Sequence, residues 1–301
     1  MLDLEVLADT FLRAADAVSQ LMRDERLSAT INFKDLNHLP RTARSMAQCI
    51  VTSADLNVQE CVLCRLLDCG LANFAMVAEE STPSVAKFQS DSASVGTLFL
   101  DPIDGTLTYA QGCLTFESAA RKAGFSPETI SSVQAQRDPR LYGFVLGAQI
   151  PQVGVVSVCS LPELGIVYHA INDHAFRQRL PLKCPPPPRT RCWVVSSSIL
   201  DSPDSRSALS ALEGICVRRS GSNAAALWRL LEDNCSGYVA VNKPFDGQLA
   251  AVVARAAGLL VTDKDGAPFT AQRLRGCEES LVWAFTRTEL RRLSTIAALA
   301  N

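Results

Sequence analysis

Two acids directly follow an apolar run in the stretch Gly96-Thr97-Leu98-Phe99-Leu100-Asp101-Pro102-Ile103-Asp104-Gly105-Thr106. Residues 97–100 predict a buried β-strand, because the run is short, apolar and bounded by turn residues. Pro102 fixes its own φ at about −65°, which turns the chain so that Asp101 and Asp104 converge. Gly105 permits a close approach of the backbone to a ligand. If a helical turn follows, the amides of Gly105 and Thr106 form an anion site.

The pair of carboxylates predicts a cation site, because two negative charges held together repel one another unless a cation neutralises them. Hard oxygen ligands select Mg²⁺, Ca²⁺ or Mn²⁺. Further acids are available in Glu79-Glu80, which follow a predicted strand, and in Asp246, which precedes a predicted helix. Two adjacent metal ions beside phosphate-binding amides form a site for phosphoryl hydrolysis. Taken alone, residues 101–106 are equally compatible with a β-turn that carries capping residues.

Further short motifs accompany this stretch along the chain. They are Val51-Thr52-Ser53-Ala54-Asp55, Ala78-Glu79-Glu80-Ser81, Gly221-Ser222-Asn223-Ala224-Ala225, Phe245-Asp246-Gly247-Gln248-Leu249-Ala250-Ala251 and the segment 258–266. In order and spacing, these motifs and residues 101–106 resemble the inositol monophosphatase superfamily. Its members are metal-dependent, lithium-sensitive phosphomonoesterases and include the 3′(2′),5′-bisphosphate nucleotidases. The resemblance extends from about residue 55 to about residue 269.

The resemblance implies a site for two Mg²⁺ ions. Glu79, Asp101 and the carbonyl of Ile103 would bind one ion. Asp101, Asp104 and Asp246 would bind the second, so that Asp101 bridges the two.

The resemblance also implies how water and phosphate are held. Glu79 and Thr106 would hold the attacking water, and Asp55 would orient Thr106. The amides of Gly105 and Thr106 would hold the phosphate oxygens. A metal ion lowers the pKa of a water molecule that it binds, so no covalent enzyme intermediate is required.

Substrate contacts are expected from Ser222, Asn223 and Lys243. Lys243 would meet a second phosphate, as in the bisphosphate nucleotidase branch, or would be a solvated lysine. The acid with which inositol monophosphatases grip the inositol hydroxyls falls on Val239 or Ala240, whose side chains accept no hydrogen bond.

The function implied by the resemblance is Mg²⁺-dependent hydrolysis of a small phosphorylated metabolite similar to an inositol monophosphate. The alternatives within the superfamily are a 3′(2′),5′-bisphosphate nucleotidase, which the presence of Gln59 slightly favours, and a sugar bisphosphatase. The alternative from another class is a protein that binds metal or a phosphorylated ligand without catalysis. The resemblance further implies a homodimer that Li⁺ inhibits.

Helical and strand patterns surround the acidic motifs. Apolar spacing predicts an amphipathic helix over residues 4–22 and a second helix that Asp55 caps and that ends near Leu67. Residues 144–148, 153–158 and 164–170 predict an antiparallel meander of strands. Residues 113–140 are expected to form an insertion with two helices, which is either a substrate lid or a surface excursion.

The run Pro185-Pro186-Pro187-Pro188 predicts a boundary, because polyproline joins neither a helix nor a sheet interior. It separates an expected α+β subdomain (1–184), which carries most metal ligands, from an expected α/β subdomain (189–301), which carries the last ligand and the substrate contacts. After it, strands predicted at 192–195, 215–217 and 238–241 alternate with helices predicted at 204–212, 224–231 and 248–257. The expected fold class is α/β, and the resemblance implies a layered αβαβα sandwich.

The composition is typical of a globular protein, with 301 residues of which 48% are apolar and 20% charged. The 29 basic and 31 acidic side chains give a net charge of −2. No global basic field therefore exists to bind a nucleic-acid polymer or a membrane surface. The first residues lack the regions of a signal peptide and no apolar run reaches the length of a membrane span, so the expected location is the cytoplasm.

The 11 cysteines are expected to be reduced thiols. Cys61, Cys64 and Cys69 are expected near the apolar face of the second helix, where a thiol acts as a small hydrophobe. The alternative is a zinc site, although structural zinc normally has four ligands. The histidines, among them His169 and His174, lie outside the motifs and are expected to be structural or surface residues.

Overall fold

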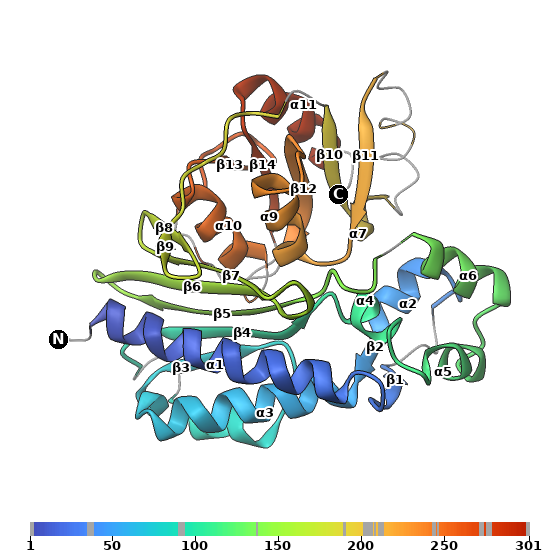
Figure 1. Cartoon of the computed structure of the whole chain (residues 1–301), viewed down its shortest axis with the longest axis horizontal. Helices are drawn as coiled ribbons and strands as arrows, with labels where there is room; N and C mark the ends of the chain where they lie inside the picture. The colour runs from blue at the N-terminus through green and yellow to red at the C-terminus, as the bar shows by residue number, and fades with distance from the viewer. Residues whose placement is uncertain are drawn as a thin grey trace.

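The computed structural model describes residues 3–34, 39–89, 94–136, 138–188, 191–200, 207, 209, 214–242, 245, 247–270, 274 and 279–298. These residues form five stacked layers, in which helices and sheets alternate (Figure 1). A seven-stranded sheet and a five-stranded sheet enclose a helical layer, and further helices cover the outer face of each sheet. The predicted α/β class and the αβαβα layering are confirmed.

The first layer consists of α1 (Leu4–Glu25) and α3 (Ser53–Asp68), which pack side by side on the seven-stranded sheet (Figure 1). Both helices were predicted from the apolar spacing, but the cap of α3 was not. Thr52 is the N-cap residue, and Asp55 lies one turn inside the helix, where its carboxylate accepts from the Thr52 amide at 2.7 Å. The prediction that Asp55 caps the helix is therefore wrong, because the Thr52 hydroxyl faces the Asp55 amide and forms the other half of a capping box.

The seven-stranded sheet has its strands in chain order, and only its first pair, β3 with β4, is parallel. The register between β4 and β5 shifts between Asp101 and Asp104, an irregularity typical of a β-bulge, and pairing resumes between Asp104 and Gly143. The predicted meander is confirmed, because β5, β6 and β7 pair antiparallel. The strands are β3 (Ala75–Ala78), β4 (Thr97–Asp104), β5 (Gly143–Ile150), β6 (Gly154–Leu161), β7 (Ile166–Ile171), β8 (His174–Arg177) and β9 (Leu180–Pro181).

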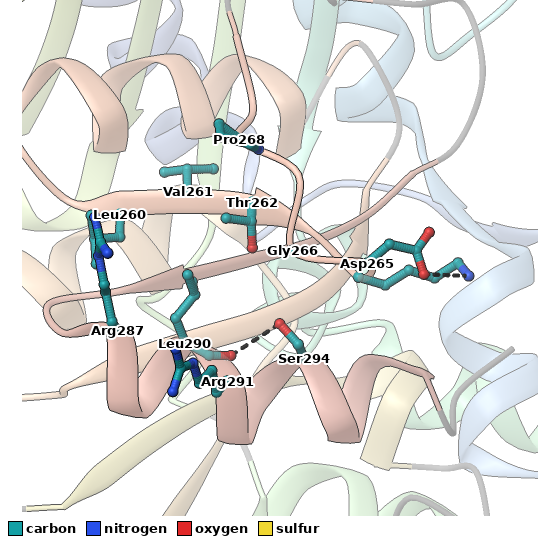
Figure 2. A pocket seen from close by; sticks show the side chains of 11 residues that line it. Leu260, Val261, Thr262, Asp265, Gly266, Pro268, Arg287, Leu290, Arg291 and Ser294 are labelled. Carbon is teal, nitrogen blue, oxygen red and sulfur yellow. Dashed lines mark hydrogen bonds and ion pairs between the residues drawn. The ribbon is translucent and has the colours of Figure 1, made fainter.

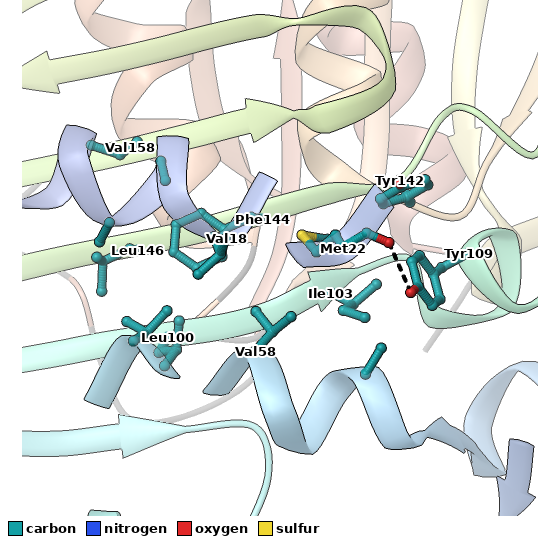
Figure 3. Packing of buried hydrophobic residues seen from close by; sticks show 14 of the residues in the cluster. Val18, Met22, Val58, Leu100, Ile103, Tyr109, Tyr142, Phe144, Leu146 and Val158 are labelled. Carbon is teal, nitrogen blue, oxygen red and sulfur yellow. Dashed lines mark hydrogen bonds between the residues drawn. The ribbon is translucent and has the colours of Figure 1, made fainter. Parts of the chain in front are cut away.

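The core under this sheet fixes the end of β4. Figure 3 shows Val18 and Met22 of α1 and Val58 of α3 facing Leu100 and Ile103 of β4. The Tyr109 hydroxyl, beyond the end of β4, donates to the Met22 carbonyl at 3.0 Å (Figure 3). Packed apolar side chains of α1 and α3 and one buried hydrogen bond thus fix the main chain at residues 101–106.

The five-stranded sheet has the order β11-β10-β12-β14-β13. Its first three strands are parallel and β14 runs antiparallel to both of its neighbours. Two helices, α9 (Asn223–Leu231) and α10 (Gly247–Ala256), lie between the two sheets, while α7 (Ser197–Leu200) and α11 (Arg287–Ala298) lie on the other face (Figure 1). The strands are β10 (Cys192–Ser196), β11 (Cys216–Ser220), β12 (Gly237–Asn242), β13 (Leu260–Asp263) and β14 (Glu279–Ala284).

The alternation predicted after the proline run is confirmed at all three strands and at the last two helices. Most of the helix predicted at 204–212 lies outside the described residues. Residues 182–188, which include the proline run, form neither helix nor strand. Among the described helices, none combines the length and the apolarity needed to cross a lipid bilayer.

Smaller elements surround the end of β4. The insertion at 113–140 contains its two predicted helices, with Gly124 in the left-handed region at a φ of 87°. These helices contact β1 and α2. The elements are β1 (Ile31–Phe33), α2 (Ala43–Cys49), β2 (Ile50–Thr52), α4 (Thr106–Ala110), α5 (Phe116–Lys122) and α6 (Pro127–Ala135).

The three neighbouring cysteines are not a buried group. Cys61 is half-buried and packs on the core, whereas Cys64 and Cys69 are exposed. The expectation for Cys64 and Cys69 is therefore wrong, because Val58, Val62 and Leu66 turn the opposite face of α3 to the core. The three thiols do not form a metal site, because no three His, Cys, Asp or Glu side chains among the described residues lie close enough to hold one ion.

His169 of β7 makes the stability of the fold pH-dependent. Its buried ring stacks on Phe176 of β8, with 4.7 Å between the ring centroids. Burial lowers the pKa of His169, and the charge of Arg179 lowers it further. The folded state then binds this proton less readily than the unfolded chain. The contribution of His169 to stability is therefore complete above about pH 6.5 and is lost as the pH falls from there towards the folded pKa.

When the pH is lowered from about 7.5 to about 5.5, we expect the free energy of unfolding to fall less in His169→Phe, which keeps a stacked ring, than in the wild type. His174→Asn, at an exposed histidine on the neighbouring strand, should keep the wild-type pH dependence. Urea unfolding at the two pH values measures both. A wild-type pH dependence in His169→Phe would contradict the assignment.

Candidate active site

The end of β4, the start of α4 and the N-terminus of α9 meet at one point. Asp101 is 3% and Asp104 2% exposed, so both predicted carboxylates are buried. Gly105 links β4 to α4 with a φ of 94°, and a Cβ atom there would lie 2.9 Å from the Gly221 carbonyl oxygen. Only glycine fits this position, because it needs both the left-handed backbone and the close contact with the turn that precedes α9.

Asp104 binds the N-terminus of α9. Its Oδ2 accepts from the Ser222 hydroxyl at 2.8 Å and from the Ala224 amide at 2.7 Å, and its Oδ1 accepts from the Asn223 amide at 3.0 Å. Burial raises the pKa of Asp104, and the hydrogen bonds from Ala224, Asn223 and Ser222 oppose that rise. An anionic side chain at a helix N-terminus is electrostatically favourable. This contact therefore joins the seven-stranded sheet to the helical layer between the sheets.

Asp55 and Thr106 form the predicted pair. The Thr106 hydroxyl lies 3.0 Å from Asp55 Oδ1 and 3.1 Å from the Ile103 carbonyl oxygen, and it donates its one proton to these acceptors. The other carboxylate oxygen of Asp55 accepts from the Thr52 amide and hydroxyl, both at 2.7 Å. Burial raises the pKa of Asp55 to about 7, and the negative charge of Glu79 adds to the rise. A nearby cation would reverse the effect of Glu79.

Glu79 and Glu80 follow β3, and their side chains interact with different groups. The Glu79 amide donates to the Leu100 carbonyl at 3.1 Å, which fixes it beside β4. The negative charge of Glu79 adds to the effect of burial in raising the pKa of both Asp55 and Asp104. Glu80 instead forms an ion pair with Lys34.

Gln59 of α3 holds this segment by its backbone. Its amide nitrogen donates to the Glu80 carbonyl at 2.6 Å, and its amide oxygen accepts from the Glu80 amide at 3.1 Å. Gln59 is fully buried. The sequence placed Gln59 one helical turn beyond Asp55 but gave no signal for this contact or for the Lys34 pair, because the partners are more than 20 residues away.

The residues fit a hard cation in part. Glu79, Asp101 and the Ile103 carbonyl are all oxygen donors on adjacent backbone segments, as Mg²⁺ and Ca²⁺ require. Within the described residues, however, no three acidic, His or Cys side chains converge tightly enough for one ion. Asp104 would have to exchange one of its hydrogen bonds to α9 for a bond to a metal. Asp246 lies outside the described residues.

The expected substrate residues are turned towards protein. The Ser222 hydroxyl accepts from the Ala225 amide at 3.0 Å while it donates to Asp104, and Asn223 Oδ1 accepts from the Tyr238 hydroxyl at 2.8 Å. Val239 and Ala240 are buried on opposite faces of the five-stranded sheet. Lys243 lies outside the described residues. A role for Ser222 and Asn223 in binding substrate stays a prediction.

We expect Ser222→Ala to lower the unfolding free energy by about 2 kcal/mol or more, because it removes both the α9 cap and one donor to the buried Asp104. Ser126→Ala, which removes only the cap of α6, should lower it by about 1 kcal/mol. Urea unfolding of both variants makes the comparison. Equal losses would show that the Asp104 contact adds nothing.

Solved structures with this fold include the IMPase of Thermotoga maritima (TM-score 0.69, 15% identity, covering 97% of this chain and 96% of the other). They also include the extragenic suppressor protein SuhB of Bartonella henselae (TM-score 0.68, 16% identity, covering 97% and 98%). An IMPase/NADP phosphatase solved with NADP and Ca²⁺ has a TM-score of 0.67 at 14% identity over 99% of this chain and 96% of its own. At these identities the likeness establishes the fold.

A search of curated protein sequences finds no match. The sequence profile of the inositol monophosphatase family, in contrast, matches residues 3–296, which is nearly the whole chain. The chain therefore belongs to the inositol monophosphatase family of metal-dependent phosphatases.

Proposed function

We propose that this protein is a Mg²⁺-dependent phosphomonoesterase that uses a water molecule to hydrolyse a small phosphorylated metabolite similar to an inositol monophosphate. The hydrogen bond between Thr106 and Asp55 carries the proposal. A protein that merely binds metal or phosphate needs acids and amides but has no use for a hydroxyl held by a buried carboxylate beside them. Family membership supports the same reaction class.

Glu79, Asp101 and the Ile103 carbonyl are the groups that would hold the cation. A bound Mg²⁺ ion supplies positive charge against the phosphate and lowers the pKa of water. The buried position of Asp101 keeps bulk water from competing with these contacts, since exposed charges are strongly screened.

Thr106 positions the nucleophile. When its hydroxyl donates to Asp55, its oxygen lone pairs are left to accept a hydrogen bond from water. Asp55 keeps this direction fixed because its second oxygen is bound to Thr52. The proton of the hydroxyl then points away from the water, so the water is oriented with an oxygen lone pair free to attack phosphorus.

The backbone at Gly105 and Thr106 would bind the phosphate. The first amides of a helix have no acceptor within that helix, and α4 begins at Thr106. The turn at Gly105 lies so close to the turn before α9 that residue 105 has no room for a side chain, and this packing supports amide directions that are set before substrate arrives.

The test is release of inorganic phosphate from inositol monophosphates, 3′-phosphoadenosine 5′-phosphate, fructose 1,6-bisphosphate and histidinol phosphate. Each is assayed with Mg²⁺, with EDTA, and with Mg²⁺ plus Li⁺. We expect turnover of at least one compound that EDTA abolishes and Li⁺ inhibits. Absence of turnover across the panel, with Mg²⁺ binding intact by calorimetry, would favour the non-catalytic binding protein.

In the same assay we expect Asp101→Asn to lower turnover by more than about 100-fold, because it removes a charged metal ligand. Thr106→Val, which keeps the shape but loses the hydroxyl, should lower turnover while leaving Mg²⁺ affinity within about threefold of the wild type. Asp173→Asn, at an exposed acid paired with Arg255, is the control. Full activity in Asp101→Asn would overturn the metal assignment.

A further inference from the structure

A pocket lies on the outer face of the five-stranded sheet, between the edge strand β13 and helix α11 (Figure 2). Its volume is about 520 Å³, within the range of small-molecule sites. The helix that contacts Asp104, α9, packs on the opposite face of the same sheet. The pocket is therefore separate from the candidate active site.

The base of this pocket is apolar but contains one buried hydroxyl. Leu260 of β13 and Leu290 of α11 are half-buried and face each other across it (Figure 2). Thr262, two residues along β13 and so on the same face as Leu260, is 6% exposed. Its hydroxyl oxygen is buried and makes no hydrogen bond with any described residue. Buried hydroxyls nearly always have a partner, so a ligand with an acceptor group would satisfy this one.

Cations surround the mouth of the pocket. Lys264, Arg287 and Arg291 line it and are exposed, and the only acid in the described lining, Asp265, pairs with Lys264 at 3.4 Å. Neither arginine forms an ion pair with a described residue. Because α11 begins at Arg287, the positive end of the helix dipole adds to the same potential.

We propose that this pocket binds a small amphipathic anion, a molecule with an apolar body and one carboxylate or phosphate group. The apolar body packs between Leu260 and Leu290. The anionic group lies against Arg287 and Arg291, and one of its oxygens accepts a hydrogen bond from the Thr262 hydroxyl. This ligand is distinct from the proposed substrate, and its binding does not depend on the metal site.

Phenylacetate is a suitable probe, because it has this chemistry and no phosphate to hydrolyse, and phenylacetamide is its neutral counterpart. We expect calorimetry to show phenylacetate binding at millimolar concentration and phenylacetamide binding at least about fivefold more weakly. Arg291→Gln should weaken phenylacetate binding about fivefold, whereas Arg292→Gln, at an exposed arginine of α11 outside the lining, should leave it unchanged. Binding should persist in Asp101→Asn and with EDTA.

Thr262→Val separates a ligand contact from a tolerated buried hydroxyl. It keeps the side-chain shape, so the protein without probe should unfold at the same or a higher temperature while phenylacetate binds more weakly. No phenylacetate binding at about 10 mM, or equal binding in the wild type, Arg291→Gln and Thr262→Val, would overturn the proposal. Loss of phenylacetate binding in Asp101→Asn would place the probe in the candidate active site and overturn it equally.

Discussion

The carboxylate of Asp104 accepts four hydrogen bonds from Ser222, Asn223 and Ala224 at the N-terminus of α9, and the rest of the site depends on this contact. Asp104 ends a strand of the seven-stranded sheet, while α9 belongs to the layer between the sheets. The contact thus sets the distance between the two halves of the chain at the site. It also holds the Gly105 turn against Gly221, and so fixes where α4 begins and where Thr106 points.

Burial of acids is the other constraint. Asp55, Asp101 and Asp104 are each almost fully buried, and the charge of Glu79 acts on two of them. Donors from α9 offset the cost of burying Asp104, and donors from Thr52 and Thr106 offset the cost of burying Asp55, while the neighbouring Glu80 pairs with Lys34. Glu79 and Asp101 are the carboxylates that the proposed function assigns to the cation, and membership of a metal-dependent family supports that proposal.

The sequence was sufficient to predict those parts of the fold that depend on local patterns. The strand before Asp101, the meander of β5, β6 and β7, and helices α1 and α9 follow from apolar periodicity, and the motifs identify the family. It was insufficient where contacts join distant segments. Asp104 and Ser222 lie 118 residues apart, and Gln59 reaches the Glu80 backbone from another layer. The antiparallel strand β14 was not predicted, because a strand's direction and partners depend on tertiary packing rather than on its own residues.

The most direct test of the central claim is the location of the metal. Crystals of the protein grown with Mn²⁺ in place of Mg²⁺ give an anomalous signal that identifies the ion independently of any activity. The proposed function predicts an Mn²⁺ peak bounded by the carboxylates of Glu79 and Asp101, beside the Thr106 hydroxyl. An electron density map at saturating Mn²⁺ with no anomalous peak between these two side chains would contradict it.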